Sequence, residues 1–145
     1  MDASAPGGKT AFIGTFNGHQ YSMCAAAATF DLIESGEVLH SINASWAKLR
    51  DGFNSLVAKH GIAACINGSG GHFQVYFRKE LPTNYREAAD TDRLKYTKYV
   101  NAMQENGCWC SQNPLSHHVL SVKHDAAVID QVLAAMDKSL QIAAE

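Results

Sequence analysis

The chain has 145 residues, of which 46% are hydrophobic and 18% are charged, as in folded globular domains and unlike disordered segments. Its formal net charge of -2 argues against a nucleic-acid-binding surface, which normally carries a basic patch. The longest nearly apolar run, residues 23–33, is too short to cross a bilayer, and the N-terminus lacks the pattern of a signal peptide. We therefore expect no membrane segment, and a cytoplasmic protein with reduced thiols.

The first part of the chain predicts an extended start followed by two helices. Residues 1–12 are rich in Gly, Ala and Pro without any period, which indicates an extended segment. A first helix is expected to begin at Gln20 or Tyr21 and to stop at Ser35-Gly36, because glycine ends helices without a Cβ penalty. A second helix should end at Gly61, and its apolar stripe recurs at steps of three and four residues: Leu39, Ile42, Trp46, Leu49, Phe53 and Leu56.

Two strands are predicted after the second helix. Residues 62–66 form a short apolar run, and residues 67–71 (Asn-Gly-Ser-Gly-Gly) form a turn cluster. Residues 73–77 alternate between apolar and polar side chains, which is the period of a half-buried strand. These three segments together predict a hairpin.

The rest of the chain completes a mixed fold. Residues 82–87 are interpreted as a loop, and Asp90 or Thr91 is expected to cap the helix that follows. The remaining predicted elements are that helix up to Asn106-Gly107, short strands at residues 108–111 and 118–122, and a last helix with Asp125 in its first turn. The order ααββαββα predicts an α+β domain with a small, mainly antiparallel sheet backed by helices.

The most informative motif is Gly-Thr-Phe-Asn-Gly at residues 14–18, directly before the first helix. Glycine, asparagine and a hydroxyl at a helix start offer free backbone N–H groups and a side-chain donor next to the positive end of the helix dipole. This arrangement is typical of an anion site. A tight turn with a helix cap is the alternative interpretation.

This motif and the small-residue helix after it are similar to the GTFNGNP-type segment of class III aminotransferases and glutamate-1-semialdehyde aminomutases. The resemblance covers residues 13 to about 143 and also rests on four later segments: Leu32-Ile-Glu-Ser-Gly-Glu-Val-Leu, Leu49-Arg-Asp-Gly-Phe, Asn84-Tyr-Arg-Glu and His124-Asp-Ala-Ala-Val-Ile-Asp. It implies the small C-terminal domain of a fold-type I enzyme that uses pyridoxal phosphate (PLP). Residues 1–19 would then be an extended segment with the loop, and residues 20–145 the small domain including the helix that connects it to the large domain.

The resemblance also implies a site shared between subunits. Gly14 and Thr15 correspond to the pair that binds the cofactor phosphate from across the dimer interface. The implied partners are the large domain and a second copy of the chain, in a homodimer. The function implied is amino-group transfer, to which this chain contributes the phosphate loop and a domain that closes over the substrate.

Several departures from the family pattern concern catalysis. The Schiff-base lysine of the family lies in a Ser/Asp-Lys-x-Ile/Leu-Gly-Gly-Gly motif, and none of the eight lysines here lies in such a motif. We therefore expect no catalytic residue in this chain and no cofactor on the chain alone. Aminomutases usually carry Phe-Glu near Pro114-Leu115, where this chain has no carboxylate, so mutase and transaminase substrates both remain open.

A cluster of cysteine and histidine near the C-terminus is the other candidate for chemistry: Cys108, Cys110, His117, His118 and His124. The C-x-C spacing differs from the usual spacing of structural zinc sites, and both cysteines should face the core with Trp109 opposite. We therefore expect no metal site there. The alternative function for the whole chain is a free-standing, non-catalytic module for dimerisation or small-molecule binding.

Overall fold

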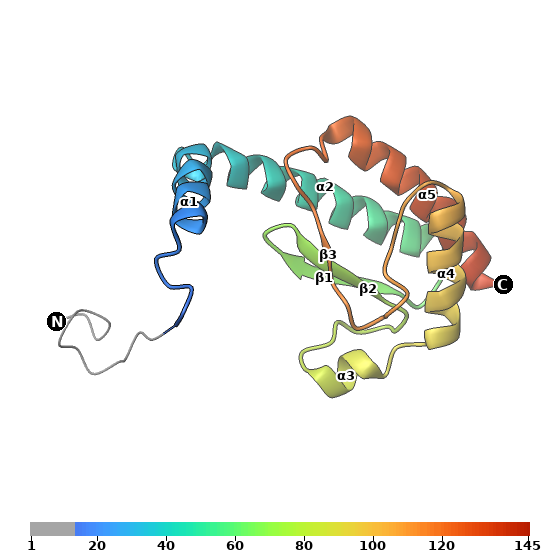
Figure 1. Cartoon of the computed structure of the whole chain (residues 1–145). Helices are drawn as coiled ribbons and strands as arrows, with labels where there is room; N and C mark the ends of the chain where they lie inside the picture. Colours follow the sequence, from blue (N-terminus) through green and yellow to red (C-terminus); the bar gives the residue numbers. More distant parts are fainter. Residues whose placement is uncertain (1–13) are drawn as a thin grey trace. The chain divides into compact units, whose positions relative to one another are not determined.

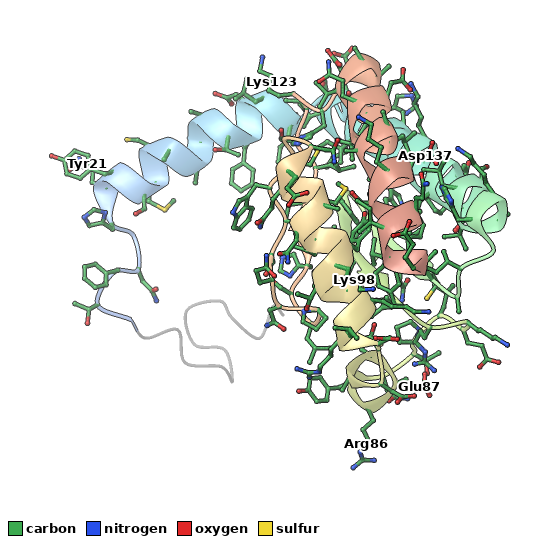
Figure 2. All side chains as sticks on the ribbon, turned by 90° about the vertical axis from the view of Figure 1, so that its right-hand side faces the viewer. Tyr21, Arg86, Glu87, Lys98, Lys123 and Asp137 are labelled. Carbon is green, nitrogen blue, oxygen red and sulfur yellow. The ribbon has the colours of Figure 1, made fainter. Side chains whose placement is uncertain are left out.

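The computed structural model describes residues 14–145, so the extended segment expected at residues 1–12 lies outside the described residues (Figure 1). The chain divides into two compact units, one ending at Gly36 and one comprising Glu37–Glu145. In the first unit, helix α1 (Gln20–Ile33) has the predicted bounds and contains no buried residue. Gly36 follows it with a φ of +77°, the left-handed conformation that glycine adopts freely. Figure 2 shows Tyr21 pointing away from this helix near its start.

The second unit begins with α2 (Glu37–His60), the longest helix among the described residues. Its buried side chains, Trp46, Leu49 and Phe53, come from the predicted stripe. Gly61, with a φ of +62°, ends the helix where the sequence predicted. The hydrophobic period therefore predicted both the helix and the face that it buries.

Three antiparallel strands form the sheet, in the order β1-β2-β3: β1 (Cys65–Ser69), β2 (His72–Tyr76) and β3 (His118–Val119). The first strand was predicted too early, at residues 62–66. Pairing instead continues to Ser69, opposite His72, and leaves only Gly70-Gly71 as the turn. Both glycines have positive φ, +58° and +84°, as in the two-residue type I′ turns whose twist matches that of the strands.

The loop predicted at residues 82–87 is wrong in its second half, because a short helix, α3 (Tyr85–Ala89), begins there. Asn84 caps it by accepting a hydrogen bond from the N–H of Glu87 at 3.1 Å. The Glu87 carboxylate accepts in return from the Asn84 amide at 2.7 Å and from the Thr83 N–H at 2.8 Å. The Thr83 backbone bond is the main reason that the pKa of Glu87 lies below its usual value. This reciprocal pattern is a variant of the capping box, in which the carboxylate accepts from the Asn84 side chain and the Thr83 backbone in place of the Asn84 backbone, and Asn84-x-x-Glu87 fits the sequence signature.

Helix α4 (Arg93–Glu105) is capped by Asp92, whereas the sequence indicated Asp90 or Thr91. A carboxylate oxygen of Asp92 accepts from the N–H groups of the second and third helical residues, both at 3.0 Å. Thr91 is used elsewhere: its hydroxyl oxygen accepts a hydrogen bond from the N–H of Phe77 at 2.9 Å. Asp90 follows α3 as its C-cap residue.

The strand predicted at residues 108–111 does not form, and β3 is shorter than the predicted 118–122. Side chains replace ladder partners in this segment: the Gln104 amide donates to the Cys110 carbonyl at 2.9 Å, and the Ser111 N–H donates to Nε2 of His118 at 3.3 Å. The observed order is therefore ααββααβα. The α+β class and the antiparallel sheet backed by helices are confirmed.

The last helix, α5 (Ala126–Ala144), is capped by Asp125 and packs beside α2 and α4. In the view of Figure 1, α2 and α5 lie together above the sheet, and α3 lies below it. The core between helices and sheet is built from fully buried side chains: Leu49, Phe53, Val75, Tyr96, Val100, Met103, Ile129, Met136 and Leu140.

A cluster of charged side chains joins the end of α2 to α5. The Asp137 carboxylate, labelled on α5 in Figure 2, lies 2.7 Å from Nζ of Lys59 and 2.6 Å from Nε2 of His60. Hydrogen bonds from Lys59 first, and then from His60, hold the pKa of Asp137 below its usual value. A lowered carboxyl pKa stabilises the folded state above the unfolded pKa, and this contribution is lost as the pH falls through the folded value.

We expect Asp137→Asn to lower the free energy of unfolding at pH 7 by less than about 1 kcal/mol, since the pair is partly exposed and screened. The difference from the wild type should shrink below about pH 4, where the wild-type carboxylate also becomes protonated. Urea unfolding of both proteins at a series of pH values measures this difference in the free energy of unfolding. Asp130→Asn is the control. Asp130 pairs with Lys48 and is more exposed than Asp137, so its replacement should lower the free energy of unfolding by less. An unchanged difference down to about pH 2.5 would contradict the assignment.

Candidate functional site

The loop before α1 folds as two successive turns. The N–H of Asn17 donates to the carbonyl of Gly14 at 3.0 Å, and the N–H of His19 donates to the carbonyl of Phe16 at 3.1 Å. Gly18 has a φ of +73°, so the chain reverses there at a position that favours glycine. The structure thus brings Gly14 and Thr15 within one short turn at the entrance to the helix.

The start of α1 retains unused backbone donors. The first helical hydrogen bond runs from the N–H of Met23 to the carbonyl of His19 at 2.9 Å. The N–H groups of the three residues between them have no acceptor within the helix. His19 is the N-cap residue and makes no side-chain capping bond within the described part of the chain. An uncapped helix start of this kind favours anions.

The side chains around the loop are polar or aromatic and open to solvent. Thr15 is exposed, and the side chain of Asn17 folds over Gly14, where an added Cβ would lie 2.9 Å from Oδ1. Nδ1 of His19 lies 3.2 Å from the hydroxyl of Ser22, and its ring lies between those of Phe16 and Tyr21 at 6.1 and 5.7 Å. Residues 14–22 include no carboxylate that would repel an anion.

The segment that the resemblance aligns with the Phe-Glu of aminomutases lies beside the sheet in the second unit. The Tyr96 hydroxyl donates to the Ser111 carbonyl at 2.8 Å, and the Gln74 amide donates to the Pro114 carbonyl at 2.7 Å. Leu115 follows with a half-buried side chain. This segment therefore offers carbonyl oxygens and an apolar side chain where the relatives in the resemblance offer an acid.

The cysteines behave as the sequence predicted even though their segment is not a strand. Cys108 and Cys110 pack against the core, while Trp109 between them is 82% exposed. Burial, followed by the proximity of Cys108, raises the pKa of Cys110 to about 11. A thiol with this pKa is protonated at neutral pH and is a poor nucleophile or metal ligand. Within residues 14–145 no group of three or more His, Cys, Asp or Glu side chains is arranged to hold a metal ion.

A hollow of about 380 Å³ opens on the sheet and was not predicted from the sequence. It is lined by Asn67, Gly68, Ser69, His72, Phe73, Gln74, Tyr76 and His117. His117 is near the cysteines in sequence, whereas the fold brings it to His72, 45 positions earlier. Strand register was the missing information, because His72 pairs with Val119.

Comparisons with known proteins give relatives that match nearly the whole chain. No protein-family profile matches the chain. It is 28% identical over 138 residues to the glutamate-1-semialdehyde 2,1-aminomutase of Nitrosomonas europaea, covering 95% of this chain and 32% of that protein. It is 35% identical over 135 residues to that of Methanothrix thermoacetophila, covering 93% of this chain and 31% of that protein. The chain thus spans about a third of the curated relatives that it matches.

Solved structures share the fold. An omega-transaminase from Sphaerobacter thermophilus superimposes with a TM-score of 0.75 at 18% identity, over 94% of this chain and 32% of that one. A transaminase with PLP bound superimposes with a TM-score of 0.74 at 20% identity, over 99% of this chain and 32% of that one.

No helix in residues 14–145 has the length and apolar character needed to cross a membrane. The chain is similar to glutamate-1-semialdehyde 2,1-aminomutases in sequence and to transaminases in fold, over about a third of the length of those proteins.

Proposed function

We propose that this chain supplies the cofactor-phosphate loop and the substrate-closing small domain of a PLP-dependent enzyme that transfers amino groups. The observation that carries the proposal is the uncapped start of α1 directly after residues 14–18. Backbone N–H groups at such a start, together with a threonine hydroxyl, match the acceptor oxygens of a phosphate. The absence of carboxylates in residues 14–22 agrees with an anionic ligand.

The residues of this chain fit the phosphate of the cofactor and not its reactive carbon. Gly14 and Thr15 would hold the phosphate, with Gly18 allowing the turn that directs the loop onto the helix. PLP, when bound, supplies an electron sink at the reacting carbon of an amino substrate. The lysine that would hold it covalently has no counterpart in a matching motif here, so a separate large domain would provide it.

The proposal includes a homodimer. In it, Gly14 and Thr15 of one subunit would contact the phosphate bound by the other. Helix α1 would connect the large domain to the small domain, so that residues 1–19 form the loop segment and residues 20–145 the small domain with its connecting helix. The exposed apolar side chains of α1 support this role, because a connecting helix buries several sides only within the complete assembly. Donor, acceptor and the choice between mutase and transaminase stay open, since Leu115 stands where a substrate-binding acid would distinguish them.

A chimera tests the loop directly. Residues 14–145 would replace the matching segment of the Methanothrix thermoacetophila aminomutase, which supplies the remaining two thirds of the protein. We expect the chimera to retain PLP and Thr15→Ala to weaken PLP binding roughly ten- to a hundredfold. This loss corresponds to about 1.5–3 kcal/mol for a hydrogen bond to a charged phosphate. Equilibrium dialysis with absorbance detection measures the dissociation constant.

Thr29→Ala is the matched control. Its hydroxyl donates to the carbonyl of Ala25 at 2.8 Å within α1, away from the loop, so PLP affinity should not change. Equal affinity of the Thr15→Ala and Thr29→Ala chimeras would remove Thr15 from the site. A folded chimera that retains no PLP would contradict the proposed function and favour the free-standing module.

A further inference from the structure

Two histidines that are distant in sequence meet on the sheet. His72 is the first residue of β2, and His117 directly precedes β3. Their ring centroids lie 5.1 Å apart with an interplanar angle of 42°, and both residues are exposed. His118, the next residue, pairs with Phe73, and its Nε2 accepts from the Ser111 N–H, so it belongs to the other side of the sheet.

Gln74, which lines the same hollow, has a buried polar atom without a partner among the described residues. Gln74 is two residues from His72 along β2 and therefore on the same face of the sheet. Its side chain is buried, with only 4% of the residue exposed, and its amide nitrogen donates to the Tyr96 hydroxyl at 3.1 Å and to the Pro114 carbonyl at 2.7 Å. Its Oε1 has no hydrogen-bond partner among the described residues. A buried acceptor of this kind is stabilised when a bound ligand brings a donor to it.

We propose that His72 and His117 bind a divalent transition-metal ion of the first row, and that a water on the metal donates to Oε1 of Gln74. Two imidazoles on one tetrahedral ion have nitrogens about 2 Å from the metal, which places their ring centres roughly 5 Å apart. The observed 5.1 Å matches that spacing. The site is independent of the proposed phosphate loop, since all its residues lie in the Glu37–Glu145 unit.

The composition of the hollow limits the choice of ion. The residues that line it include no lysine, arginine, carboxylate or thiol. The other polar side chains of the lining, such as those of Asn67 and Ser69, are neutral. Imidazole suits Zn²⁺, Cu²⁺ and Ni²⁺, whereas Mg²⁺, Ca²⁺ and Mn²⁺ favour oxygen ligands. Two neutral imidazoles without a charged ligand give a site of moderate affinity that keeps several waters.

Calorimetric titration of the untagged chain with NiCl₂ at about pH 8, where imidazole is neutral, tests the site. We expect one ion per chain, and weaker binding of MnCl₂, as the usual order of metal affinities dictates. His72→Ala and His117→Ala should each weaken Ni²⁺ binding at least about tenfold, the lower end of the loss when even a supporting residue of a metal site is removed.

His40→Ala is the matched control: His40 is exposed in the same unit, on α2, and outside the hollow. Its removal should leave Ni²⁺ binding unchanged. His40→Gln is a second control, which keeps a polar side chain at the position, and it should behave as His40→Ala does. Unchanged affinity in either His72→Ala or His117→Ala, provided that variant retains the wild-type circular dichroism spectrum, would overturn the proposal. So would an equal loss in His40→Ala, or Mn²⁺ binding as tight as Ni²⁺.

Discussion

Replacing Phe53 by alanine is expected to lower the free energy of unfolding of the Glu37–Glu145 unit by about 3–5 kcal/mol. Phe53 is fully buried on α2, in the core between helices and sheet, so the variant loses the transfer energy of the ring and leaves a cavity behind. This is a large share of the roughly 5–15 kcal/mol typical of small domains. Urea unfolding followed by the fluorescence of Trp46, which is buried in the same core, measures the change.

Phe30→Ala provides the control for this measurement. Phe30 lies on α1 in the other unit and is 65% exposed, so its removal should change the unfolding of the second unit by less than about 0.5 kcal/mol. The comparison therefore tests both the core and the division of the chain into two units. Similar losses in the two variants would show that α1 contributes to the core, contrary to the exposure of its side chains.

The helices were predictable because each carries its own signal. In α2 the apolar stripe and Gly61 predicted the extent and the buried face, and in α5 Asp125 marked the start. These signals are local, since a helix satisfies its hydrogen bonds within a few residues. The signature Asn84-x-x-Glu87 is equally local, but Pro82 just before it favours a loop, so α3 was not predicted.

The strands were less predictable because their bounds depend on distant partners. The end of β1 is set by the two-residue turn at Gly70-Gly71, whereas the Asn-Gly at the centre of β1 is itself typical of a turn. Residues 108–111 have the composition of a strand, yet side chains of Gln104 and His118 satisfy their backbone groups. No local pattern distinguishes these two ways of pairing a backbone.

The two candidate sites differ in the same way, because one lies within a single segment and the other is formed across two strands. The loop at residues 14–18 is contiguous, so its resemblance to a family segment predicts Gly14 and Thr15 as phosphate ligands, which stays a prediction. The meeting of His72 with His117 depends on the register of β2 against β3, which alternation alone does not fix. A site within one segment can therefore be proposed from sequence, whereas the meeting of His72 with His117 requires the fold.

The second large effect is expected on self-association through α1. The first unit exposes several large apolar side chains, in the loop before α1 and around the helix: Phe16, Tyr21, Met23, Phe30 and Leu32. Monomers rarely expose contiguous apolar patches beyond a few hundred Å². We therefore expect the isolated chain either to dimerise, most simply about a twofold axis that uses the same helix from both copies, or to leave its first thirty-odd residues disordered or repositioned.

Leu32→Ser should weaken this dimer more than about a hundredfold. A twofold axis presents each residue twice, so the change removes two buried leucines, worth about 3–6 kcal/mol if both are fully covered. Leu81→Ser, at an exposed leucine outside α1, is the control and should leave the dissociation constant unchanged. Sedimentation equilibrium over a range of concentrations measures both, and hydrogen exchange on the same samples reports the protection of residues 20–33. A strict monomer at high concentration with a well-protected α1 would contradict the proposed homodimer, because the helix would then be stable with its apolar side chains in water.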